Sequence, residues 1–131
     1  MKSFILDCLG AIAIVAIASL TVPFFADYRA RAESGGWLAQ MQDTQQLIAA
    51  RALKAGTLSG AGIGIDTPQL ESSVPDLLRI EDSGMIIIKG GHAGQTLLLI
   101  PALSEGRISW TCIGGPDDAV PEHCRIAMPQ S

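Results

Sequence analysis

The feature that most constrains this chain is an uncharged segment near its N-terminus, which runs for 19 residues from Cys8 to Ala26. At about 1.5 Å of rise per residue, a helix of this length spans roughly 28 Å, close to the hydrocarbon thickness of a bilayer. We therefore predict a membrane helix that stays on the chain. The alternative is a cleavable signal peptide, whose apolar region is usually only about 7–15 residues long. Lys2 precedes the segment, so the positive-inside tendency predicts a cytoplasmic N-terminus and an exported remainder.

The composition of the chain suits one small domain with an apolar anchor. It has 131 residues, of which 48 % are hydrophobic and only 17 % are charged, whereas soluble domains average about 25 % charged residues. The formal net charge is −4. Binding to nucleic acid through bulk electrostatics needs clustered Lys and Arg, so we expect no sequence-specific nucleic-acid partner.

A second pattern follows the apolar segment, where the chain becomes amphipathic. Apolar residues recur mostly at three-, four- or seven-residue spacing, which is typical of a helix with one buried face. We predict one long helix from about Ser3 to Lys54, weakened at Pro23 and at Gly35–Gly36 and stopped by Gly56. The apolar positions are Tyr28, Ala32, Trp37, Leu38, Met41, Ile48 and Ala52.

The rest of the chain has loop and strand patterns. Residues 55–76 are rich in Gly, Ser, Thr and Pro and predict a connecting loop, which we expect to pack on the domain through Leu58, Ile63, Ile65 and Leu70. Strands are predicted at LLRI, at Ile86–Ile88, at about 95–100 and at about 106–112, with a short last one at Arg125–Met128.

Short turns between these strands imply antiparallel neighbours. The predicted fold is therefore α+β: a long N-terminal helix whose apolar half (1–26) protrudes, packed on an antiparallel sheet of three to four strands. The globular part is 27–131, with the amphipathic helix half at 27–54, the sheet within 77–111 and a C-terminal disulfide loop at 112–124.

Two of the three cysteines, Cys112 and Cys124, lie near each other in a Gly- and Pro-rich segment. A disulfide closing this loop would add roughly 3 kcal/mol in the loop-entropy model and would persist only in an oxidising compartment. A metal site made of Cys112, His123 and Cys124 is the minor alternative, since neighbouring residues do not readily point at one ion. Cys8 lies in the apolar run, where a free thiol packs as a small hydrophobe.

No set of residues in the chain predicts catalysis, so we expect neither an enzyme nor a cofactor nor a resident metal. His92 and His123 are interpreted as exposed loop residues. An acidic turn of Asp117, Asp118 and Glu122 could offer oxygen ligands to calcium, although a solvated turn is the simpler interpretation.

Asp7 is the unusual carboxylate, because it lies at the edge of the apolar run. An unpaired carboxylate deep in the bilayer costs about 2–3 kcal/mol. Asp7 either sits at the headgroup level or pairs with a positive group, such as the N-terminal amine of another copy. A buried charge pair of that kind adds little net stability but can fix register.

Both ends of the chain resemble type IV pilins. The N-terminal segment matches the pilin helix in its Phe, its early acid, its proline and the Asp-Tyr-x-x-Arg segment that follows, at Phe4, Asp7, Pro23, Asp27, Tyr28 and Arg31. The C-terminal segment resembles the pilin disulfide loop at Trp110, Cys112, Pro121, Cys124 and Arg125. The order of helix, loop, antiparallel strands and disulfide loop agrees as well.

This resemblance implies a structural subunit of a type IV pilus, a surface filament used for adhesion, twitching motility or DNA uptake. The apolar helix would be stored in the inner membrane with a cytoplasmic N-terminus, and would later pack against copies of itself in an extracellular filament. The implied partners are other copies in a helical homopolymer, a pilus assembly ATPase with its inner-membrane platform, a prepilin peptidase, and host or abiotic surfaces. The implied assembly positions are Phe4, Asp7, Leu9, Ile12, Ile14, Ile17, Leu20, Pro23, Phe24 and Phe25.

Three other interpretations stay open at this stage. A pseudopilin or minor pilin of a type II secretion system would share the helix and fold but form a short periplasmic piston. A single-span periplasmic binding module would stay monomeric after extraction from the membrane. A membrane-anchored enzyme would need a deep polar cleft.

Overall fold

The computed structural model describes residues 27–71 and 73–125. The predicted membrane helix, Asp7, Cys8, every implied assembly position from Phe4 to Phe25, and residues 126–128 of the predicted last strand lie outside this part of the chain. Within the described residues, no helix is both long and apolar enough to cross a bilayer.

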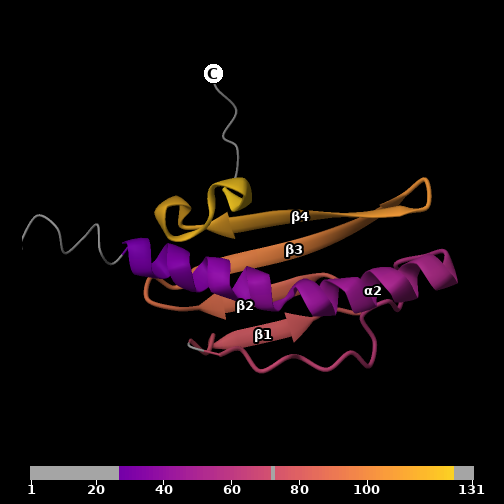
Figure 1. Ribbon diagram of the computed structural model, residues 1–131, viewed down its shortest axis with the longest axis horizontal. Coiled ribbons are helices and arrows are strands. Elements are labelled where there is room, and N and C mark those ends of the chain that lie inside the picture. The colour runs from indigo at the N-terminus through magenta and orange to yellow at the C-terminus, as the bar shows by residue number, and fades with distance from the viewer. Residues whose placement is uncertain (1–26, 72, 126–131) are drawn as a thin grey trace, which may run out of the picture.

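The described chain is a helical layer packed on one antiparallel sheet (Figure 1). A helical segment at 27–40 leads into α2 (Gln42–Ala55), and the sheet has four strands in the order β1-β2-β3-β4. The predicted α+β fold is thus confirmed with four strands. The strands and the short 3-10 turns that follow them are β1 (Leu77–Ile80), β2 (Ile86–Gly90), β3 (Gln95–Ser104), β4 (Arg107–Gly115), η1 (Asp117–Ala119) and η2 (Glu122–Cys124).

The helix is interrupted at Met41, where the axis changes direction (Figure 1). The predicted weak point at Gly35–Gly36 is therefore wrong, because both glycines lie inside the helical segment 27–40. A glycine destabilises a helix by about 1 kcal/mol relative to alanine, but it keeps its N–H and C=O groups. Tertiary packing can therefore keep a helix continuous at a glycine. The predicted stop is confirmed: Gly56 has a φ of 74° and donates its N–H to the carbonyl of Ala52.

One face of the sheet and the helical layer together form the core. The strand register places Ile86 and Ile88 of β2 beside Leu99 and Leu97 of β3 on the covered face, and all four side chains are buried. Fully burying such side chains stabilises the fold by about 1.5–3 kcal/mol each. The helical layer contributes Trp37, Met41, Ile48 and Ala52, as the apolar spacing predicts.

Two apolar positions predicted for the buried helical face are instead exposed. Tyr28 is 64 % exposed and Ala32 is also exposed, whereas Ala30 in the same turns is buried. In their place, the polar side chain of Ser34 is fully buried.

The connecting loop packs mostly as expected, through half-buried Leu58 and Ile65 and buried Leu70. Ile63 is the exception, because its side chain is 57 % exposed. The backbone of Ile63 is used instead: its N–H donates to Gly60 and its carbonyl accepts a hydrogen bond from the guanidinium of Arg51. The neighbouring Ala61 occupies the core position.

The last two strands are longer than predicted, since β3 continues through Pro101 to Ser104 and pairs with β4 along the whole hairpin. Proline has no N–H to donate, so a strand tolerates it where that N–H would have no partner strand, as at an edge. Here β2 ends opposite Leu99, so Pro101 lies where β3 pairs with β4 alone. The predicted strand at Arg125–Met128 is reduced, in its described part, to a single parallel bridge between Arg125 and Gly114.

Candidate functional site

The predicted disulfide between Cys112 and Cys124 is confirmed, with a Cα–Cα distance of 4.6 Å. It joins η2 to the middle of β4, so the segment after the sheet folds back on it. Arg125 Nε donates to the carbonyl of Asp117 at 2.8 Å, which closes the segment internally. Ser34 Oγ donates to the carbonyl of Ala119, also at 2.8 Å, which ties the segment to the helix.

The disulfide loop brings the ligand atoms of Cys112, His123 and Cys124 within 4.8 Å of one another. The expectation that neighbouring His123 and Cys124 do not readily point at one place is therefore wrong, since both lie in or at the end of the η2 turn with ligand atoms near that of Cys112. The thiolate is the metal-binding form of cysteine, and the disulfide occupies both sulfurs. In the described part of the chain no other group of three acidic, His or Cys side chains converges, so the exposed acidic turn of Asp117, Asp118 and Glu122 does not form one.

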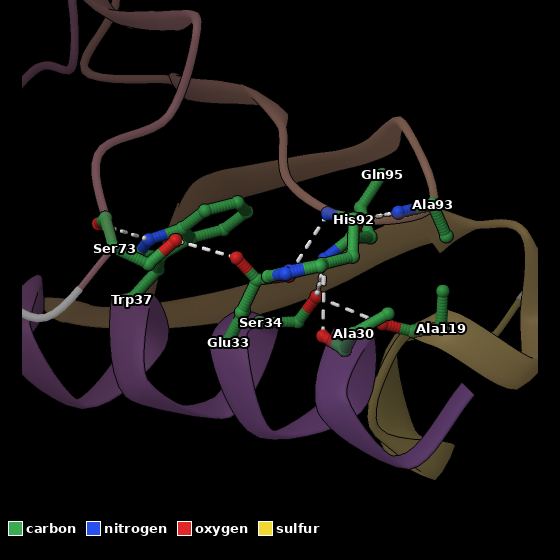
Figure 2. Close-up of polar contacts among 9 residues, drawn as sticks. All are labelled: Ala30, Glu33, Ser34, Trp37, Ser73, His92, Ala93, Gln95 and Ala119. Carbon is green, nitrogen blue, oxygen red and sulfur yellow. Dashed lines mark hydrogen bonds and ion pairs between the residues drawn. The ribbon is translucent and has the colours of Figure 1, made fainter. Parts of the chain in front are cut away.

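A polar network is centred on Glu33, on the inner side of the helical segment 27–40 (Figure 2). The Glu33 side chain is only 10 % exposed. Its Oε1 accepts the backbone N–H of His92 at 2.9 Å and lies 2.7 Å from Nδ1 of the same residue. Its Oε2 accepts a hydrogen bond from the hydroxyl of Ser73. One carboxylate therefore joins the helix to the segment before β1 and to the turn between β2 and β3.

These contacts decide the protonation of Glu33. Burial by itself raises the pKa of this carboxyl, but hydrogen bonds from Ser73, from His92 and from Gln95 outweigh it. The result is a pKa lowered from 4.5 to about 2. Glu33 is therefore a stable anion at neutral pH, because several donors stabilise the charged form.

Gln95 continues the network into the core, where its side chain is fully buried. Its Nε2 donates to the carbonyl of Ala30 at 3.0 Å, and its Oε1 accepts the N–H of Ala93 at 2.9 Å. A buried amide is tolerated only when its donors and acceptor are paired. Gln95 thus links the first described helical turns to the start of β3.

A second anchor lies beside this network. Trp37 Nε1 donates to the carbonyl of Ser73 at 2.9 Å, and its ring is buried. The segment before β1 is therefore attached to the helix by two bonds at Ser73, one through its hydroxyl and one through its carbonyl (Figure 2). Tyr28, Glu33 and Trp37 also line a shallow hollow of about 280 Å³ on this side.

The network contains a serine, a carboxylate and a histidine, but their order differs from that of a hydrolytic triad. In a triad the imidazole lies between the nucleophile and the carboxylate. Here Glu33 lies between Ser73 and His92. A carboxylate with a pKa of about 2 is a poor base for a hydroxyl. What this arrangement does is hold three chain segments together around one charge.

The sequence patterns gave no role to Glu33, Ser34, Ser73 or Gln95. A usable signal was the glycine-rich stretch at 90–94, which allows a tight turn whose backbone can approach a helix closely. The partner of that turn depends on how the helix is rotated over the sheet, which periodicity alone does not give.

No protein-family model matches this chain, and no curated protein resembles it significantly. The chain is therefore described by its fold alone. That fold is an N-terminal helix packed on a four-stranded antiparallel sheet, with a C-terminal disulfide between Cys112 and Cys124.

Proposed function

We propose that this chain is a structural subunit of a type IV pilus, which polymerises through its apolar N-terminal helix into a surface filament. The observation that carries the proposal is the combination of two features. The uncharged run ends at Ala26, and the described residues that follow it, 27–40, are helical. That segment belongs to a helical layer on a four-stranded sheet with a disulfide at its C-terminal end.

The head, by which we mean the globular part of the chain at 27–71 and 73–125, has the properties that a filament subunit needs. The helical layer is fastened to the sheet, to the segment before β1 and to the disulfide loop through Glu33, Ser34 and Gln95. A force applied along the helix would therefore reach the whole head. Three large apolar side chains of the helical layer stay exposed, at Tyr28, Leu47 and Leu53, and are available to neighbouring subunits.

Polymerisation of such a subunit needs an external source of energy. Burying an Ile, Leu or Phe side chain stabilises a protein by about 1.5–3 kcal/mol relative to water. A side chain that moves from lipid into a filament core gains little of this, because it has already left water. An assembly ATPase and a membrane platform are therefore the partners that this proposal requires.

The disulfide favours a pilus subunit over a secretion pseudopilin. The pseudopilin alternative would be favoured by bound calcium near 114–122, and the acidic side chains of this region do not converge on one point. In the proposed filament, the connecting loop and the disulfide loop lie at the outer surface and set its adhesive character.

The proposal is tested by electron microscopy of material sheared from the cell surface, together with mass spectrometry of the N-terminal peptide. We expect regular fibres of this chain with an intact, N-methylated apolar segment. Ile17→Arg should abolish the fibres, because it places a charge in the assembling surface. The matched control is Val74→Arg, at a side chain that is 80 % exposed in the connecting loop.

A second readout separates failed assembly from failed folding. The Cys112–Cys124 disulfide of the Ile17→Arg variant should still form, since both cysteines and the described core residues around them lie within 37–124. A wild-type chain that is clipped after the apolar run and recovered only as a monomer would contradict the proposal.

A further inference from the structure

A groove runs along the side of the head where the helical layer meets β4, next to the disulfide. Two hollows make it up, with volumes of about 460 and 220 Å³, and they share the lining residues Gln42, Gln45 and Trp110. The larger volume lies within the range of small-molecule sites, about 300–1,000 Å³. This groove shares no lining residue with the hollow beside Glu33.

The lining of the groove carries no Asp, Glu, Lys or Arg side chain. Its aromatic component is Trp110, which packs partly on the core and keeps the rest of its ring toward the groove. Its polar component is His123 in the larger hollow and a row of three glutamines on α2, at positions 42, 45 and 46. Positions three and four apart lie on the same side of a helix, so the three amides face the same space.

The glutamine side chains of the groove also differ from Gln40 and Gln95 in their hydrogen bonding. Gln40 donates to the carbonyl of Gly36 and accepts the N–H of Glu71, and Gln95 is fully bonded in the core. Within the described part of the chain, the side chains of Gln42, Gln45 and Gln46 have no hydrogen-bond partner, and neither does the indole N–H of Trp110. The groove thus presents several uncommitted donors and acceptors beside an aromatic ring.

We propose that this groove binds a neutral saccharide. A sugar ring presents a face of C–H groups that can stack on the indole of Trp110, and a rim of hydroxyls that both donate and accept. Each glutamine amide offers one acceptor and two donors, which matches adjacent hydroxyls. An ionic ligand would find no Asp, Glu, Lys or Arg side chain in this lining, whereas a neutral polar ligand needs none.

The expected affinity is weak for a single site. The groove is open, and each neutral hydrogen bond adds only about 0.5–1.5 kcal/mol net. A dissociation constant of about 1 mM corresponds to roughly −4 kcal/mol, which a stacked ring with a few such bonds can supply. A multivalent array of heads would bind a saccharide-coated surface far more strongly than one head does. The proposal itself does not depend on filament formation, since the groove lies within a single chain.

The test uses the purified full chain in a polyoxyethylene detergent, because a detergent with a sugar headgroup would compete for the groove. The two tryptophans give two indole N–H resonances in an NMR spectrum, and Trp110→Phe assigns the second one. Short neutral oligomers of glucose, of N-acetylglucosamine and of galactose are the probes, added at millimolar concentration. We expect at least one of them to shift the Trp110 resonance saturably and to leave that of the buried Trp37 in place.

Gln45→Leu should weaken this binding about three- to tenfold while the Trp110 resonance persists. The matched control is Gln69→Leu, an exposed glutamine outside the groove, which should bind as the wild type does. The proposal is overturned if none of the three saccharides moves Trp110, or if both indoles shift together. It is also overturned if only a proline-rich peptide moves Trp110, since the groove would then be a peptide site.

Discussion

Glu33 and His92 are 59 positions apart in the chain, yet Glu33 Oε1 lies 2.7 Å from His92 Nδ1 and 2.9 Å from the backbone nitrogen of the same residue. A single carboxylate oxygen therefore holds the turn between β2 and β3 against the helical segment 27–40. The other oxygen holds Ser73, in the segment that precedes β1. Removing this one charge should loosen three parts of the head together.

The first prediction concerns pH. Because the pKa of Glu33 is lowered from 4.5 to about 2 on folding, the folded head binds fewer protons at Glu33 than the unfolded chain does. Its contribution to stability is fully present above about pH 4.5 and is lost as the pH falls toward about 2. Glu33→Gln should cost about 1–2 kcal/mol at neutral pH, after allowance for solvent screening.

Urea unfolding followed by tryptophan fluorescence at a series of pH values checks this. The gap between wild type and Glu33→Gln should close on acidification, whereas the control Glu105→Gln, at an exposed hairpin tip, should track the wild type throughout. A gap that stays constant down to pH values near the lowered pKa would show that the carboxylate charge contributes nothing.

The second prediction concerns the buried amide of Gln95. Gln95→Leu keeps much of the volume but leaves the N–H of Ala93 without its acceptor and the carbonyl of Ala30 without its donor. We expect a loss of about 1–3 kcal/mol. Hydrogen exchange should rise first in the turn at 91–94 and at the start of the described helix, while the paired centre of β3 stays protected. Uniform exchange across the head would contradict this local role.

The third prediction concerns the disulfide. Replacing both Cys112 and Cys124 by Ser reopens a loop with a sequence separation of 12, and should cost about 3 kcal/mol in the loop-entropy model. Reduction of the wild type by a small dithiol should lower the free energy of unfolding by a similar amount. Cys8→Ser serves as the control, since Cys8 is not part of this bridge. Equal stability of the oxidised and reduced chains would refute the assignment of a stabilising role.

The fourth prediction contrasts two glycines. Gly84 has a φ of +90°, and a Cβ built there would lie 2.7 Å from Ile48 Cγ2, so Gly84→Ala should destabilise the head by more than 1 kcal/mol. Gly35 lies inside the helical segment with nothing within 4 Å of an added Cβ. Gly35→Ala should therefore stabilise the head by about 0.5–1 kcal/mol. Thermal melts of the two variants check the opposite signs.

Much of the fold was predictable because its signals are local. The spacing of Trp37, Met41, Ile48 and Ala52 correctly predicted the buried helical face, and the positive φ of Gly56 explains why the helix ends where glycine predicts. The alternation of buried and half-buried residues in β3 reflects the two-residue period of a strand, because its apolar run at 97–100 does not itself alternate. The interruption at Met41 was not predictable in the same way, since methionine is a good helix former.

The Glu33 network could not be predicted from the sequence, for a different reason. The pattern at 27–54 treats glutamate as a solvent-facing residue, which is the usual case. The burial of Glu33 is favourable only because Ser73, His92 and Gln95, from other parts of the chain, donate hydrogen bonds to its two carboxylate oxygens. The convergence of His123 with Cys112 and Cys124 likewise involves the η2 turn, which the disulfide joins to β4.

The sequence by itself determined the class of the elements, the end of the helix, the face that it buries from Trp37 to Ala52 and the pairing of two cysteines, because periodicity, turn chemistry and loop length depend on residues that are close in sequence. Only the tertiary structure decided which polar groups meet. The rotation of the helix over the sheet, and the path of each turn, bring donors and acceptors together across dozens of residues. The distances between these donors and acceptors depend on how the whole chain packs, and no single segment determines them.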